Sequence, residues 1–170
     1  MEKRIDYHFQ ESLVSRQNRA EHEMLEKFHA GDYTMEHPLI CLNPYFISPL
    51  TAVILFKTEK KIAVTLTVKG KEAEGDITHT FAPATEHILP VLGLYADCDN
   101  KVELRAYQSK PVTHTIHTDP LDENVPELLS IETTAAYMED NMIFLSPSMS
   151  ELATAIDYHG DIRWHLNVPT

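Results

Sequence analysis

The spacing of hydrophobic positions changes near residue 38, from a helical period to the alternation typical of strands. Within the first thirty residues apolar side chains recur every four positions, at Ile5, Phe9 and Leu13 and again at Ala20, Met24 and Phe28. Gly31 follows this stripe at the position of a C-terminal helix glycine. We therefore expect an amphipathic helix over residues 5–30 that lies on a larger body. The polar stretch 15–19 interrupts the stripe and favours a break in the helix there.

Beyond Pro38 the apolar segments are short and bounded by turn residues, which is typical of strands. The segments are residues 39–42, 52–56, 62–68, 77–81, 102–107 and 112–118. Alternation is clearest in 62–68, where Ile62, Val64, Leu66 and Val68 share one face. The charged run 57–61 is typical of a hairpin connection. Because no helical pattern lies between the strands, the sequence predicts an antiparallel β-sandwich rather than βαβ units.

The last third of the chain differs in character. A stretch rich in proline and acidic residues, 118–126, is the best candidate for a domain boundary. After it, β-type segments fall at 128–133, 142–145, 152–157 and 161–166. The last two flank Tyr158-His159-Gly160, which predicts a tight hairpin turn with a positive φ at the glycine. In that hairpin Ile162, Trp164 and Leu166 share one face.

Charge excludes several classes of partner. Lys and Arg number 14 against 26 Asp and Glu, a net charge of -12, so we expect no nucleic acid and no anionic membrane as partner. No apolar run reaches the roughly 20 residues of a membrane-spanning helix, so membrane insertion is not expected. Residues 1–7 contain no apolar signal core. The predicted location is therefore cytoplasmic, or exported if a signal peptide has been removed.

Two cysteines and a histidine-rich helix are the first candidates for chemistry. Cys41 and Cys98 form neither a disulfide framework nor a CxxC metal site; one bridge between them is conceivable, and two reduced thiols are favoured. His22, Glu26 and His29 fall along one face of the predicted helix and are potential metal ligands. A solvated, charged helix face is the favoured interpretation of those three residues.

The remaining motifs favour packing over catalysis. His79 and His114 fall on strand faces with Ile, Val or Phe neighbours, which favours hydrogen-bonded packing residues over ligands. His114 and His117 point to opposite faces of one strand and cannot chelate together. A G-x-S-x-G nucleophile elbow and a glycine-rich phosphate loop are both missing from the sequence. The sequence therefore assigns no catalytic, cofactor-binding or metal-binding residue, and no cofactor.

Five short segments in order resemble the N-terminal domain of bacterial arylsulfate sulfotransferases of the type that does not use a nucleotide donor. They are Asn43-Pro44-Tyr45 with Pro49-Leu50-Thr51-Ala52, then Val68-Lys69-Gly70-Lys71, residues 88–95, residues 100–104 and residues 157–164. The resemblance covers about residues 43–166. It implies an immunoglobulin-like antiparallel β-sandwich at 35–120, preceded by a helical segment at 1–34. Residues 121–170 would be a connection and the first strands of a β-propeller.

The resemblance also implies a function for the parent enzyme. Family members move a sulfuryl group from a phenolic sulfate ester to an acceptor phenol through a sulfurylated histidine, a nucleophile that divides one hard step into two. Those residues belong to the propeller, and none of the ten histidines here matches them. The implied partners are the propeller, with phenolic substrates only in the full-length enzyme, and a second copy in a homodimer. This chain alone would be a non-catalytic scaffold.

The sequence departs from the family pattern at both ends, because it stops at Thr170 and begins with a charged helix. This favours an excised N-terminal domain, in which the strands after Pro126 either fray or pair with a second copy. The rival hypothesis is a freestanding immunoglobulin-like binding module that holds partners through a loop at 81–86. Trp164 distinguishes the two, since the first expects it exposed unless a dimer buries it, and the second expects it buried. A small enzyme complete in itself is disfavoured because no site is apparent.

Overall fold

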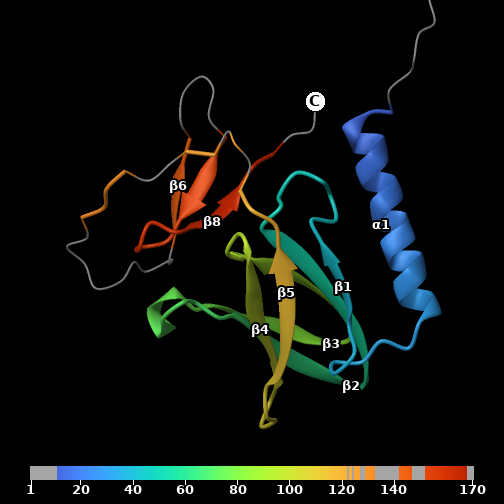
Figure 1. The fold of residues 1–170 in the computed structure, drawn as a ribbon. Helices are drawn as coiled ribbons and strands as arrows, with labels where there is room; N and C mark the ends of the chain where they lie inside the picture. The colour runs from blue at the N-terminus through green and yellow to red at the C-terminus, as the bar shows by residue number, and fades with distance from the viewer. Residues whose placement is uncertain are drawn as a thin grey trace, which may run out of the picture.

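The computed structural model describes residues 11–121, 123, 125–126, 129–132, 142–146 and 152–167. These ranges contain one α-helix, one short 3-10 helix and eight strands: α1 (Leu13–Ala30), β1 (Leu39–Leu42), β2 (Thr51–Val68), η1 (Ala73–Gly75), β3 (Ile77–Leu92), β4 (Cys98–Ala106), β5 (Val112–Thr118), β6 (Ile143–Leu145), β7 (Thr154–Ile156) and β8 (Ile162–His165). Strands β1–β5 form one antiparallel sheet and β6–β8 a second (Figure 1). The expectation of a mainly β, antiparallel fold with an N-terminal helix is confirmed.

A long hairpin, β2 with β3, forms the frame of the large sheet. The two strands pair from Thr51 opposite Leu92 to Val68 opposite Ile77. A straight strand of this length would span about 50 Å. Yet a Cβ placed on Gly93, just after β3, would come within 2.2 Å of Ile77 Cδ1 at the start of β3. The hairpin is therefore folded over on itself, and its two halves face each other as the layers of a sandwich.

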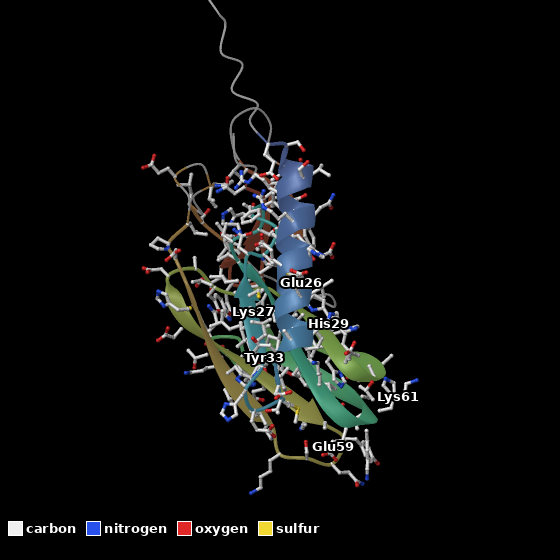
Figure 2. All side chains as sticks on the ribbon, turned by 90° about the vertical axis from the view of Figure 1, so that its right-hand side faces the viewer. Glu26, Lys27, His29, Tyr33, Glu59 and Lys61 are labelled. Atoms are coloured by element: carbon white, nitrogen blue, oxygen red, sulfur yellow. The ribbon has the colours of Figure 1, made fainter. Side chains whose placement is uncertain are left out.

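The fold-over occurs where the pairing of β2 with β3 changes register, between Lys57 and Val64. The prediction of a hairpin at 57–61 is wrong, because β2 runs through these residues and keeps the same partner strand on both sides. The predicted loop at 81–86 is wrong as well, since it lies inside β3. Figure 2 shows Glu59 and Lys61 at this bend, beyond the C-terminal end of α1. A bulged strand bends without reversing, and its charged side chains remain in solvent.

Each half of β2 has its own neighbours. β1 pairs with the first half, and β4, which in turn pairs with β5, pairs with the second half. Side chains of both halves meet in one apolar core: Leu50, Ala52, Ile54, Phe56, Val64, Leu66, Val68, Leu89, Val91, Leu94, Val102, Leu104 and Ile116. The predicted inward face of residues 62–68 is confirmed by the burial of Val64, Leu66 and Val68.

Helix α1 covers the outer face of the first half of β2. Met24 and Phe28 pack against Leu39, Val53 and Leu55, which explains why residues 52–56 form a continuous apolar run rather than alternating. The second half has no such cover, and its outer face is polar. The first half of β2 is therefore continuously apolar because both of its faces are buried, whereas the second half alternates because only one face is buried.

The helix itself is continuous from residue 13 to residue 30, so the expected break at 15–19 is wrong. Ser12 is its N-cap, and its Oγ accepts a hydrogen bond from the Ser15 N–H. At the other end Gly31 adopts an extended conformation rather than a left-handed one. Lys57 Nζ instead donates to the carbonyl oxygens of His29 and Gly31, at 3.2 and 3.1 Å. The part of the predicted helix at residues 5–10 lies outside the described residues.

Candidate functional site

The C-terminal hairpin, β7 with β8, lies against one end of the sandwich (Figure 1). Its turn is as predicted, with φ +85° at Gly160 and a hydrogen bond from the Gly160 N–H to the Asp157 carbonyl. Its faces are not as the apolar residues suggest. Arg163 and His165 of β8 are buried, whereas Ile162 and Trp164 on the other face are half-buried. The hairpin thus meets the sandwich through a polar and charged face.

Arg163 is at the centre of this contact and is fully buried, with 0 % of its surface exposed. Nε donates to the Gly93 carbonyl at 2.8 Å. Nη1 lies within 3.1 Å of the Gly75 carbonyl, 3.0 Å of Tyr95 Oη and 3.0 Å of Asp157 Oδ2. We call Arg163, Asp157 and Tyr95, with the Gly75 and Gly93 carbonyls, the Arg163 cluster. Since its acceptors lie in three separate segments, the guanidinium holds those segments together.

Asp157 supplies the compensating charge and also shapes the hairpin turn. Its side chain is 1 % exposed, and its Oδ2 forms the ion pair with Arg163. Its other oxygen, Oδ1, accepts hydrogen bonds from the N–H groups of His159 and Asp161, at 3.0 and 3.1 Å. A buried charge is tolerated only when it is paired and hydrogen-bonded, and this carboxylate is both.

Tyr95 provides an aromatic surface for the guanidinium. The Arg163 Cζ atom lies 3.9 Å from the centre of the Tyr95 ring, within the range of a cation–π contact. The Tyr95 hydroxyl accepts a hydrogen bond from the Lys71 N–H at 3.1 Å. Burial raises the pKa of this phenol above its ordinary value, while the Lys71 N–H and Arg163 oppose the rise. The phenol therefore remains protonated at neutral pH.

Two glycines admit the arginine between the loops. A Cβ on Gly75 would lie 3.2 Å from Tyr95 Oη and 3.6 Å from Arg163 Nη1. Gly93 has φ +83°, a left-handed conformation that disfavours other residues. Both carbonyls can approach the guanidinium closely because no side chain stands at either position.

Outside the cluster, further polar contacts fix the hairpin. Lys71 Nζ forms an ion pair with Asp161 at 2.6 Å. The indole N–H of Trp164 donates to Ser48 Oγ at 3.1 Å, and the Asn167 N–H donates to the Ile47 carbonyl at 2.8 Å. These contacts join the hairpin to the segments on both sides of β2. Because Arg163 and Asp157 are inaccessible to a substrate, the arrangement is suited to hold two parts of a protein in one orientation rather than to catalyse a reaction.

The histidines that the sequence singled out do not come together in one site. His22 Nε2 lies 3.2 Å from Glu26, and His29 lies 3.8 Å from Glu86 on β3, so the three helix residues do not converge. Within the described ranges, no group of three or more His, Cys, Asp or Glu side chains is placed to hold a metal ion. His114 Nε2 contacts the Met35 carbonyl at 2.8 Å, as expected of a hydrogen-bonded packing residue. His79 packs edge-on against Phe81.

The two cysteines are free thiols, as favoured from the sequence. Both are partly buried, and burial raises the pKa of each thiol. Since a raised pKa lowers the fraction of reactive thiolate, neither has the character of a catalytic nucleophile.

Sequence reasoning missed the Arg163 cluster and one buried histidine. The alternation in β8 puts Ile162 and Trp164 on one face, but it does not say which face of the hairpin meets the sandwich. An arginine opposite an apolar strand face ordinarily lies in solvent, so the local pattern gave no signal for the burial of Arg163. His87 is buried and stacks on Phe56, with ring centres 4.6 Å apart. His87 precedes the buried Leu89 and Val91 by two and four residues, so the alternation of β3 was the signal that could have found it.

The antiparallel arrangement of β1–β5 is consistent with an immunoglobulin-like domain. Residues 39–120 match the family model of the arylsulfotransferase Ig-like domain. The match spans β1 to the end of β5 and excludes α1 and the C-terminal hairpin. The search of curated proteins finds no match to the sequence. None of the helices in the described part of the chain is long and apolar enough to cross a membrane.

Proposed function

We propose that the chain is a non-catalytic scaffold and interface domain of an arylsulfate sulfotransferase. The observation that supports this most directly is the match of residues 39–120 to the arylsulfotransferase Ig-like domain. In this proposal the full-length enzyme transfers a sulfuryl group from a phenolic sulfate ester to an acceptor phenol. The nucleophile is a histidine of a partner β-propeller in the same protein, and the sandwich holds that propeller in place.

The Arg163 cluster supports the scaffold role because it sets the orientation of the C-terminal hairpin. Arginine hydrogen bonds are directional, and Arg163 contacts Gly75, Gly93 and Tyr95 of the sandwich at once. A segment that continues from β8 would therefore leave the sandwich in one defined direction. In our proposal this is how the domain positions the propeller.

Strand β6 is the proposed contact with the propeller. Among the described residues it pairs only with β7, and all three of its side chains, Ile143, Phe144 and Leu145, are exposed. An exposed edge strand with apolar side chains is a template for another strand. In the isolated chain the same edge would pair with a second copy, which is our proposal for the homodimer. The alternative expectation, fraying after Pro126, falls largely outside the described residues.

The reading frame of the native gene beyond the codon for Thr170 tests this function. A series of repeated β-blade patterns with histidines would support the scaffold proposal. A stop codon there would overturn it and favour the rival, a freestanding immunoglobulin-like binding module. Light scattering of the chain separately tests the edge-pairing step, for which Phe144→Lys should convert dimers to monomers. A wild-type monomer at all concentrations would contradict that step.

A further inference from the structure

We propose a second site on the sandwich, a pocket at the end of β4 that binds a small aromatic anion. The proposal is independent of the scaffold role. The pocket has a volume of about 350 Å³, within the usual range of small-molecule sites. Its walls are the outer face of the large sheet and the turn after β4: Ala63, Thr65, Thr80, Arg105, Ala106, Tyr107, Gln108 and Ser109.

One row of polar side chains forms the floor of the pocket. Thr65 of β2 lies directly opposite Thr80 of β3 on one side and Arg105 of β4 on the other. Side chains of directly opposed residues have Cβ atoms about 5 Å apart, so the three side chains can contact one ligand. Strand β5 begins at Val112, opposite Leu104, so on the side away from β2 Arg105 has no strand partner and lies beside the turn.

Arg105 is an available cation. Its guanidinium forms no hydrogen bond or ion pair with another residue in the described part of the chain, and its side chain is exposed. By contrast, Lys69 pairs with Asp76, and Lys71 pairs with Asp161. A guanidinium presents a planar fork of N–H donors that matches a carboxylate or sulfonate group.

The threonines add a donor next to that cation. Thr65 Oγ1 and Thr80 Oγ1 are hydrogen-bonded to each other at 2.9 Å. One hydroxyl donates in this bond, so the O–H of the other remains available to an anion. The pair Thr67 and Thr78, one row along the same face, has the same geometry at 3.0 Å but lies outside the pocket. It provides a matched control.

The turn supplies an aromatic wall at a cost in backbone strain. Tyr107 is 83 % exposed, which is unusual for so large a side chain. The next residue, Gln108, has φ +58°, a conformation that costs a residue other than glycine about 1 kcal/mol. Ser109 closes the turn through hydrogen bonds to the Ala106 carbonyl. Backbone strain of this kind is concentrated at binding sites, and this turn places Tyr107 in the lining of the same pocket as Arg105.

The chemistry of the walls selects the ligand class. An oxyanion would bind the Arg105 guanidinium and a threonine hydroxyl, and a planar ring would stack on Tyr107. The acidic residue nearest in register is Glu103, two positions before Arg105 on the same strand. It lies in the Thr67 row, which is the next row along the sheet. The pocket should therefore favour a compact aromatic anion over a polyanion.

Titration of the ¹⁵N-labelled chain with benzoate, benzenesulfonate, phenol and inorganic sulfate tests the proposal by NMR. The two aromatic anions should shift the amide signals of residues 63–65, 80 and 105–109, and phenol and sulfate should bind at least about tenfold more weakly. If benzoate binds more tightly than benzenesulfonate, the pocket prefers a planar carboxylate. If benzenesulfonate binds more tightly, the pocket prefers a tetrahedral anionic group.

Paired variants locate the binding groups. Arg105→Gln should weaken binding about tenfold, the loss of one charged hydrogen bond, whereas Lys101→Gln on the same face of β4 should leave it unchanged. Replacing both Thr65 and Thr80 by valine removes the hydroxyl donor and should weaken binding about threefold, whereas replacing both Thr67 and Thr78 by valine should not. Tyr107→Ala should weaken it and Tyr107→Phe should not. Equal effects within each pair, binding of phenol as tight as that of benzoate, or shifts spread over the surface would overturn the proposal.

Discussion

Two peripheral elements are attached to the same sandwich by opposite kinds of contact. Helix α1 packs through apolar side chains, chiefly Met24 and Phe28. The β7–β8 hairpin packs through a buried arginine, its carboxylate and two backbone carbonyls. Apolar packing is non-directional and tolerates small shifts, whereas a hydrogen-bonded guanidinium allows one arrangement. The contrast predicts that loss of the α1 contact mainly lowers stability, whereas loss of the arginine contact changes the orientation of the hairpin.

Removal of the main apolar contact of α1 should have the largest effect. Phe28 is fully buried, and Phe28→Ala should cost about 4 kcal/mol, the usual loss for a core phenylalanine. Hydrogen exchange should show the loss in α1 and in the first half of β2, with the hairpin less affected. Val14→Ala, at an exposed position of the same helix, should be nearly neutral. Equal effects of the two substitutions would show that α1 is not held by this face.

Loss of the buried arginine should have the second-largest effect. Arg163→Met leaves the Asp157 carboxylate buried without its cation and should destabilise the hairpin by about 3 kcal/mol. The expected signature is fast amide exchange in β7 and β8 while the sandwich core stays protected. The control Arg105→Met removes an exposed arginine and should change neither the stability of the hairpin nor the amide exchange in β7 and β8.

A second-site change sharpens that result. Adding Asp157→Asn to Arg163→Met removes the uncompensated charge and keeps an oxygen for the His159 and Asp161 N–H groups. The double variant should therefore recover part of the lost protection. A double variant less stable than Arg163→Met would show that the buried charge is not the cause.

The peripheral ion pair of the hairpin should have a small effect. Lys71 and Asp161 are partly exposed, and such pairs contribute about 0.5 kcal/mol. Lys71→Met should therefore lower the free energy of unfolding slightly, and the loss should shrink at high salt. Urea unfolding at two salt concentrations measures it, with Lys60→Met, at an exposed residue of the bend, as the control. If Lys71→Met lowered the free energy of unfolding as much as Arg163→Met, the Lys71–Asp161 ion pair would be as important as the Arg163 cluster for holding the hairpin.

The smallest expected effect is a pH dependence within the sandwich. Burial lowers the pKa of His87 below its ordinary value of 6.5, while the Ala84 carbonyl opposes the shift. The unfolded chain therefore takes up the proton first, so the contribution of His87 is complete above pH 6.5 and declines as the pH falls. Urea unfolding should show a flatter acid slope for His87→Phe than for the wild type. Parallel slopes would mean that His87 does not couple folding to pH.

The same contrast explains what the sequence could predict. Alternation over Val64, Leu66 and Val68 and the helical spacing of Met24 and Phe28 report apolar burial, so the sheet and the helix were foreseeable. The bend in β2 could not be predicted, because a charged run has the same composition in a bulge as in a hairpin turn. The burial of Arg163 could not be predicted either, because its carbonyl partners Gly75 and Gly93 lie 88 and 70 residues earlier in the chain. Local patterns contain no information on such long-range acceptors.

Residual dipolar couplings of the whole chain test the central claim, that the Arg163 cluster fixes the hairpin relative to the sandwich. We predict that couplings of the described amides in β7 and β8 fit the same alignment tensor as those of β2 and β4, at full amplitude. In Arg163→Met the hairpin couplings should shrink while those of the sandwich remain. Hairpin couplings in the wild type that need a separate or much weaker tensor would contradict the account.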